Sequence, residues 1–159
     1  MKLDNKIKTF LERVEDVSLG YLDLTFFKEF ELEQTQKNYQ IIRKGEETDN
    51  DSWEKEWLII ALDSLGDQII IDTSTTELEV CLASYEEDCW DLFSLASNLS
   101  NFEKILNLLT ELSINRQQPV EIENNPLTEK DIKNFITKVE KINGGCSWYW
   151  ENFVEECGG

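Results

Sequence analysis

The sequence predicts a single α+β domain over residues 1–159, with a mostly antiparallel sheet, an N-terminal helix and C-terminal helices packed on one face of that sheet. Three observations support this class. Apolar residues recur at helical spacing near the N-terminus and again in the C-terminal third. Between these regions, three short runs of strand-forming residues follow one another with turns between them. The length is that of one domain, and 40% hydrophobic residues with only two prolines are typical of a globular protein.

The N-terminal part of the chain predicts a helix and then strands. Residues 3–14 place their apolar side chains on one stripe of an amphipathic helix. The alternating and aromatic residues 21–30 favour a strand that is followed by a less regular segment. Residues 31–42 change from polar to apolar, which favours a strand near their end, and residues 45–52 have the composition of a loop.

The centre of the chain predicts an antiparallel meander of three strands. Residues 57–62 and 68–72 are short runs of β-forming residues, and between them Gly66 suits a tight turn. A second turn leads to residues 77–82, in which apolar and polar side chains alternate with the period of a half-buried strand. Consecutive strands joined by short turns pair in the antiparallel direction, so these three strands form the central meander.

The C-terminal part predicts three helices. After Phe93 the period becomes helical, and an S-x-x-E capping box at Ser100 predicts the start of the first helix. Residues 114–127 are polar, contain both prolines and predict a connection. Thr128 then caps the next helix, and the aromatic residues 147–156 predict a short terminal helix that packs back on the domain.

The negative charge is concentrated in residues 46–91, which we call the acidic window. It holds fifteen Asp and Glu residues against one cation, Lys55, whereas the rest of the chain carries 18 acids and 14 bases. A solvated surface explains the acids but not the missing lysines and arginines, because such surfaces normally mix both signs. A surface of one sign attracts a cationic partner and rejects polyanions, so we expect no direct binding to nucleic acid or to an anionic membrane.

The residue patterns that most enzymes use are missing. The chain has no histidine, and the Gly-x-Ser-x-Gly, Gly-x-Gly-x-x-Gly and Walker A patterns are absent. A pair of Asp63 with Asp67 or Asp72 could carry acid–base chemistry, but so many acids produce chance pairs and turn aspartates commonly bond the local backbone. The D-x-D start at Asp49 lacks the other positions of a calcium-binding loop. The sequence therefore favours a protein that is not an enzyme, with no cofactor and no metal site.

The sequence also predicts a cytoplasmic protein. Its first residues contain no apolar segment of the kind that forms a secretory signal. Its strongly apolar runs of about six residues fall far short of the roughly 18 that cross a bilayer. The four cysteines have no C-x-x-C spacing, so we expect them to be reduced and partly buried.

The central stretch resembles the Smi1/Knr4 (SUKH) superfamily. Members typically have an apolar strand ending in Ala, a Gly-Asp pair, a strand ending in Asp, and a third strand after a short turn. In this chain the matching residues are Ala61, Gly66-Asp67, Asp72 and 78–82, followed by Trp90. The resemblance covers about a quarter of the chain. It implies an α+β fold and, for bacterial members, an immunity protein that neutralises a toxin domain, often a nuclease; other members are interaction scaffolds.

We expect the contact surface to lie in the acidic window, where aromatic residues stand among carboxylates. Aromatic anchors inside a charged rim are common in interfaces, although a place in the core is the default for each aromatic residue. The predicted partner-binding residues are Trp53, Glu54, Asp63, Asp67, Asp72, Glu77, Glu79, Tyr85, Glu86, Glu87 and Asp88. The expected centre of the contact surface is Glu77 and Glu79 together with Glu86, Glu87 and Asp88. The expected partner is a basic protein such as a nuclease toxin domain, and the alternative function is a housekeeping scaffold or regulator of the same fold.

Overall fold

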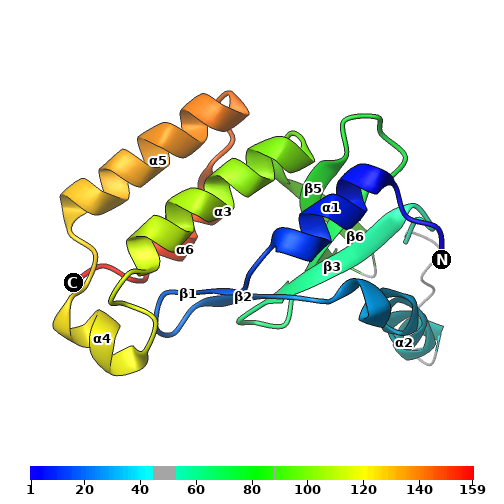
Figure 1. Ribbon diagram of the computed structural model, residues 1–159, viewed down its shortest axis with the longest axis horizontal. Helices are drawn as coiled ribbons and strands as arrows, with labels where there is room; N and C mark the ends of the chain where they lie inside the picture. Colours follow the sequence, from blue (N-terminus) through cyan, green and yellow to red (C-terminus); the bar gives the residue numbers. More distant parts are fainter. Residues whose placement is uncertain (45–52, 88) are drawn as a thin grey trace.

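A computed structural model of the chain shows a six-stranded antiparallel sheet with helices around it (Figure 1). The structure describes residues 1–44, 53–87 and 89–159, with the backbone alone for residues 39–44. The elements in chain order are α1 (Asn5–Arg13), β1 (Val17–Ser18), β2 (Asp23–Phe26), the short 3-10 helix η1 (Glu29–Glu31), α2 (Leu32–Lys44), β3 (Trp57–Asp63), β4 (Gln68–Asp72), β5 (Glu79–Glu86), β6 (Cys89–Ala96), α3 (Leu99–Ser113), α4 (Pro119–Asn124), α5 (Glu129–Asn143) and α6 (Trp148–Glu155). This arrangement confirms the predicted α+β class.

Each strand of the sheet pairs with the next one along the chain. The predicted central meander is confirmed as β3, β4 and β5, and β6 extends it on one side. Gly66, in the turn between β3 and β4, has a φ of 82°, in the left-handed region that glycine adopts without strain. The register shifts between Ile59 and Ala61 and again between Val80 and Cys81, as it does at β-bulges.

The main core lies between one face of the sheet and the helices α1, α3 and α6, which confirms the predicted packing of the terminal helices. Phe10, Phe26 and Phe102 come from α1, β2 and α3, and their ring centroids lie 5.9 to 6.2 Å apart. Trp150 of α6 is fully buried, and its indole N–H donates to the carbonyl oxygen of Leu95 at 2.8 Å. α5 packs on α3 and α6 as an outer layer (Figure 1).

The opposite face of the sheet carries a smaller cluster, whose buried residues are Ile59, Ile70, Cys81 and Ala83. Trp53 packs against this cluster, and its ring centroid lies 5.0 Å from those of Trp57 and Trp90. Burial, and then nearby carboxylates, raise the pKa of the Cys81 thiol to about 12. Because β5 buries side chains on both of its faces, it is not the half-buried strand that its alternation predicts.

The strand predicted near the end of residues 31–42 is wrong, because this segment belongs to the helix α2. The pairing of β2 with β3 stops near Phe26, so no described strand covers the beginning of β3 on that side. The side-chain amide of Gln36 takes that place: its Nε2 donates to the Ile59 carbonyl at 2.8 Å, and the Ile59 N–H donates to its Oε1 at 2.9 Å. A helix therefore satisfies a strand edge that would otherwise expose backbone groups.

Two further differences concern β6 and α4. The helical period predicted after Phe93 begins later, because β6 continues to Ala96. α3 is capped by Asn98, whose side chain accepts the N–H of Asn101 at 2.8 Å, and not by Ser100. The predicted connection between α3 and α5 contains the short helix α4, which begins at a proline as helices often do. The predicted loop over residues 45–52 lies outside the described residues.

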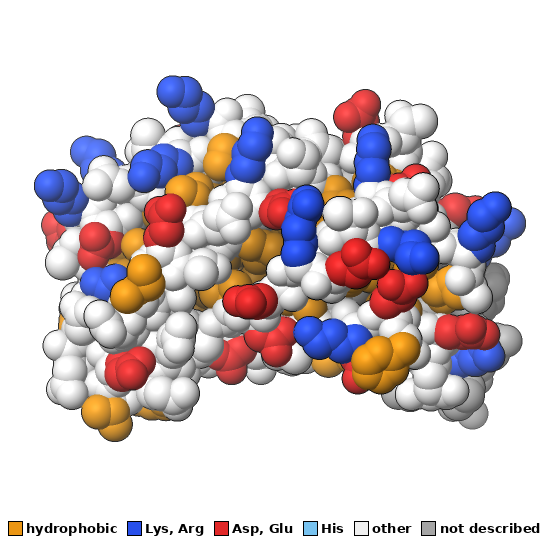
Figure 2. All heavy atoms as spheres, in the orientation of Figure 1, with side chains coloured by type: hydrophobic (Ala, Val, Ile, Leu, Met, Phe, Trp, Pro, Cys, Tyr) orange, Lys and Arg blue, Asp and Glu red, His pale blue; other side chains and the backbone are white. Residues whose placement is uncertain are grey.

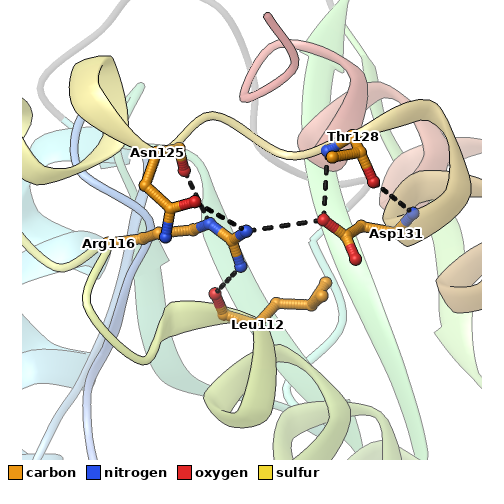
Figure 3. A network of polar contacts seen from close by, with 5 residues as sticks. All are labelled: Leu112, Arg116, Asn125, Thr128 and Asp131. Carbon is orange, nitrogen blue, oxygen red and sulfur yellow. Dashed lines mark hydrogen bonds and ion pairs between the residues drawn. The ribbon is translucent and has the colours of Figure 1, made fainter.

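Arg116 joins the end of α3 to the start of α5 (Figure 3). Its guanidinium donates to the carbonyl oxygens of Leu112 at 3.0 Å and Asn125 at 2.7 Å, and lies 3.4 Å from the Asp131 carboxylate. The Thr128 N–H donates to this carboxylate and the Thr128 hydroxyl accepts the Asp131 N–H, which confirms the predicted cap of α5. The hydrogen bond from the Thr128 backbone is the first cause that lowers the pKa of Asp131, and the charge of Arg116 adds to it.

Candidate functional site

An open groove of about 650 Å³ lies between the sheet and α6, beside the turn that joins β3 to β4. Five carboxylates and four aromatic rings line it, and we call it the acidic groove. The carboxylates belong to Asp63, Asp67, Glu86, Glu155 and Glu156, and the rings to Phe93, Trp148, Tyr149 and Phe153. Among the described residues, no lysine or arginine lines this groove.

Strand alternation and helix periodicity bring these side chains to one place. Leu82 and Glu86 of β5 are four positions apart in the sequence and therefore project from the same face of the sheet, the one that carries the helices. In α6, the lining residues occupy adjacent positions and positions three to four residues apart, so one side of the helix forms a wall of the groove. The same helix buries Trp150 in the core on its other side.

Asp63 accepts hydrogen bonds both from the turn between β3 and β4 and from α6. Its Oδ1 accepts the N–H groups of Leu65 and Asp67, both at 3.0 Å, and its Oδ2 accepts the hydroxyl of Tyr149 at 3.1 Å. Burial, followed by the charge of Asp63 and this hydrogen bond, raises the pKa of Tyr149. Asp63 is therefore a structural residue that fixes two walls of the groove relative to each other.

Asp67 has a different role, although it lies only four residues away. Its backbone N–H is held by Asp63, but no described side chain donates to its carboxylate. Burial, and then the charge of Asp63, raise the pKa of the Asp67 carboxyl. The groove thus contains a partly desolvated carboxylate that no described side chain neutralises.

Apolar surface accompanies this charge. Trp148 is 44% exposed although it is one of the largest side chains in the molecule, and Leu65 in the neighbouring turn is 83% exposed. The Trp148 ring meets the Phe93 ring edge to face at a centroid distance of 5.5 Å. Aromatic surface beside carboxylates is the composition of a protein interface and also of a site for a planar cation.

The cations of the molecule gather elsewhere. Figure 2 shows lysine and arginine side chains over α5 and over α1, on the outer side of the helical layer. The exposed lysines of α5 are Lys130, Lys133, Lys138 and Lys141. The outer helices therefore carry both signs of charge, whereas the described lining of the groove carries only acids.

The groove brings together three of the predicted partner-binding residues, Asp63, Asp67 and Glu86. A second group lies at the other end of the strands, where Asp72 pairs in register with Glu79. The eight residues of β5 separate Glu79 from Glu86 by about 24 Å, at the usual rise of a strand. Glu77 lies near Glu79, so the predicted patch is divided between two ends of the sheet.

The other predicted residues lie away from the groove. Trp53 packs on the opposite face of the sheet, and Tyr85 contacts Trp90 there at a centroid distance of 5.2 Å. Glu54 and Glu87 are exposed and do not line the groove. Asp88 lies outside the described residues.

The sequence favours core positions for the aromatic residues, so the predicted site does not include Phe93, Trp148, Tyr149, Glu155 or Glu156. A signal was present in residues 147–156. Trp148, Tyr149 and Trp150 are consecutive, and consecutive residues of a helix point in different directions. An eight-residue helix that packs one side on a core must turn some of these rings outwards.

Within the described residues, no cluster of three or more Cys, Asp or Glu side chains has the arrangement of a metal site. None of the helices in that part of the chain combines the length and the apolar composition needed to cross a membrane. All four cysteines belong to described residues and are free thiols; Cys81 and Cys157 are buried and the other two are exposed. Comparisons with protein-family models, with curated proteins and with solved structures gave no match to this chain.

Proposed function

We propose that this protein is a binding protein without catalytic activity, and that it holds a basic segment of a protein partner in the acidic groove. The observation that carries this proposal is the charge of the groove. Five carboxylates line about 650 Å³, and no lysine or arginine stands among the described lining residues. Aromatic and aliphatic side chains of the same groove supply apolar contact area, as the centre of a protein interface requires.

Electrostatics gives this groove a preference among partners. Carboxylates of one sign speed the encounter with a cationic surface and slow the encounter with nucleic acids or anionic membranes. The carboxylates also repel one another in the free protein, and lysines or arginines of a partner would relieve that repulsion. The expected partner is therefore a basic protein, and its binding should weaken as salt is added.

The resemblance of the central strands to the SUKH superfamily supports a more specific proposal. The quoted residues lie in β3, in the turn that borders the groove, in β4, in and just before β5, and in β6, which contains Trp90. In this proposal the protein is a cytoplasmic immunity protein, and the basic partner is a toxin domain of nuclease type. Carboxylates in the groove would occupy the cationic site of the toxin in place of a phosphate backbone and block access to it.

A housekeeping scaffold is the alternative function, and the exposed apolar side chains of Leu65 and Trp148 favour it. A contact that depends mainly on apolar burial would survive high salt, because screening acts on charges and not on hydrophobic burial. The salt dependence of binding therefore separates the two functions.

The test begins with the partner that co-purifies from native cells, which is then purified and recombined with this protein. Glu86→Lys, Glu155→Lys and Glu156→Lys together reverse three charges of the groove. We expect this triple variant to lose about 100-fold or more in affinity, through slower association and faster dissociation. If the partner is a nuclease, one equivalent of the native protein should block its activity, whereas the triple variant should not.

The matched control reverses three exposed carboxylates elsewhere, with Glu54→Lys, Glu77→Lys and Glu111→Lys. It changes the net charge by the same amount, so the difference between the two triple variants reports position alone. We expect a loss of less than about 10-fold for the control. Equal losses would contradict the groove as the site, and an affinity that does not change with salt would favour the scaffold.

A further inference from the structure

One carboxylate of the acidic groove, that of Asp67, has no hydrogen-bond donor among the described residues and can accept hydrogen bonds from a cation. Both oxygens of Asp63 are already occupied by the turn and by Tyr149. The carboxylate of Asp67 has no such partner among the described residues, and it is partly removed from water. A desolvated carboxylate without a hydrogen-bond donor is unfavourable, so a cation that supplies donors would gain more here than at an exposed acid.

An aromatic surface lies in the same groove. Tyr149 lies between the aspartates and the exposed indole. Its hydroxyl donates to Asp63, and its ring centroid lies 6.1 Å from that of Trp148. The charge of Asp67 contributes to the raised pKa of Tyr149. Phe93 supports the Trp148 ring from the side, so the indole is held in place while 44% of the residue stays exposed. A held, exposed indole is the best natural surface for a cation to stack on.

We propose that the groove receives an arginine side chain of the partner, with its guanidinium hydrogen-bonded to the carboxylate of Asp67 and stacked on the ring of Trp148. This inference rests on the proposed function, and it names the residue type that the groove selects. Glu86, Glu155 and Glu156 would attract neighbouring cations of the same segment, while Asp67 and Trp148 select among cations.

Arginine fits this pair better than lysine or a metal ion does. The guanidinium is planar and weakly hydrated, and it can donate two parallel hydrogen bonds to one carboxylate while its flat face stacks on a ring. The ammonium of lysine is compact and strongly hydrated, and it gains less on entering a partly apolar groove. A divalent metal would need several oxygen ligands at one point, whereas Asp63 is already hydrogen-bonded and no three acidic side chains of the described residues are arranged as a metal site.

The test titrates the full chain with N-acetyl-arginine amide at low salt and follows the indole N–H of Trp148 and the backbone N–H of Asp67 by NMR. N-acetyl-lysine amide and N-acetyl-citrulline amide are the matched probes, since citrulline keeps the shape of arginine without its charge. We expect the arginine probe to bind with a millimolar dissociation constant, the lysine probe at least about fivefold more weakly, and the citrulline probe not at all.

Asp67→Asn and Trp148→Ala should each weaken the arginine probe about fivefold or more, while Glu77→Gln leaves its affinity unchanged. Asp67→Asn keeps the shape of the side chain, so an unchanged amide spectrum outside the groove demonstrates that this variant is folded. The inference is overturned if citrulline binds like arginine, if both variants bind the arginine probe normally, or if the shifts spread over all exposed carboxylates without saturating.

Failure of this inference can be distinguished from failure of the proposed function. A basic partner that needs Glu86, Glu155 and Glu156 but binds Asp67→Asn as tightly as the native protein would overturn the arginine site and leave the proposed function standing. An arginine probe that binds as expected, with no basic partner that depends on the groove carboxylates, would support the site and contradict the proposed function.

Discussion

Two hollows of nearly equal volume lie at opposite ends of the central strands, and they differ in how their charges are satisfied. The acidic groove measures about 650 Å³, and the second hollow, beside the start of α1 and the turn after β4, measures about 630 Å³. Two lining residues of the second hollow, Lys55 and Glu56, form an ion pair, and the hydroxyl of a third, Ser74, donates to Asp72 at the end of β4. Its lining residues include both signs of charge, whereas the charged residues that line the acidic groove, among those the structure describes, are all acidic. Volume therefore does not distinguish the two hollows, whereas the balance of charge among their described lining residues does.

The largest expected difference in stability is between variants of Asp63 and Asp72, which are the last residues of β3 and β4. Asp63→Ala removes three hydrogen bonds, one of which joins the turn to α6, and leaves a buried Tyr149 hydroxyl without its acceptor. We expect the free energy of unfolding to fall by about 3 kcal/mol. Asp72→Ala removes only exposed bonds to Ser74, and should cost about 1 kcal/mol or less. Urea denaturation of both variants measures the difference, and equal losses would contradict the structural role of Asp63.

Tyr149→Phe isolates the bond between the turn and α6. The ring and its packing remain, so we expect a loss of about 1 kcal/mol in the free energy of unfolding. In a double-mutant cycle, Asp63→Ala and Tyr149→Phe should show a coupling energy of similar size, because both remove the same hydrogen bond. Additive losses would mean that the bond does not contribute to stability.

Asp67→Asn should stabilise the protein by less than about 0.5 kcal/mol near neutral pH, because it removes a charge that burial disfavours while the surrounding solvent screens most of the effect. Burial raises the folded pKa of Asp67 above its unfolded value, so the folded state binds this proton more tightly. Native stability therefore decreases as the pH rises from the unfolded pKa through the raised folded pKa, and the penalty is fully present above that range. The melting temperatures of the two proteins should differ at pH 7 and converge at acidic pH; a constant difference would contradict this assignment.

The sequence predicts much of the framework that carries both hollows. Short β-forming runs separated by a glycine turn can satisfy their backbone bonds only by pairing with each other, which is why β3, β4 and β5 are predicted correctly. The cap at Thr128 is equally local, since its donor and acceptor lie three residues apart. Structural features that depend on residues close together in the sequence, such as these strands and this helix cap, can therefore be predicted from the sequence.

The acidic groove cannot be predicted in this way, because its residues become neighbours only when the helices pack on the sheet. Asp63 and Tyr149 are 86 residues apart, and their hydrogen bond requires α6 to dock beside the turn between β3 and β4. The charge pattern of the acidic window identifies Asp63, Asp67 and Glu86, but it does not separate them from Glu77 and Glu79 at the other end of β5. α2 is missed for a related reason, since Gln36 replaces a strand partner only once the sheet has formed.

The smallest expected effect comes from Lys55, the one cation of the acidic window. Its side chain is 90% exposed and lies 3.9 Å from Glu56, so Lys55→Gln should change the free energy of unfolding by less than about 0.5 kcal/mol. The same variant also decides between two accounts of partner binding. If the whole acidic window attracts the partner by diffuse charge, removing Lys55 should speed association about as much as Glu86→Gln slows it. If the groove alone forms the contact, Lys55→Gln should leave the association rate nearly unchanged while Glu86→Gln lowers it. Stopped-flow association at low salt measures both rates, and equal and opposite changes would contradict the proposal that the partner contacts only the groove end of the sheet.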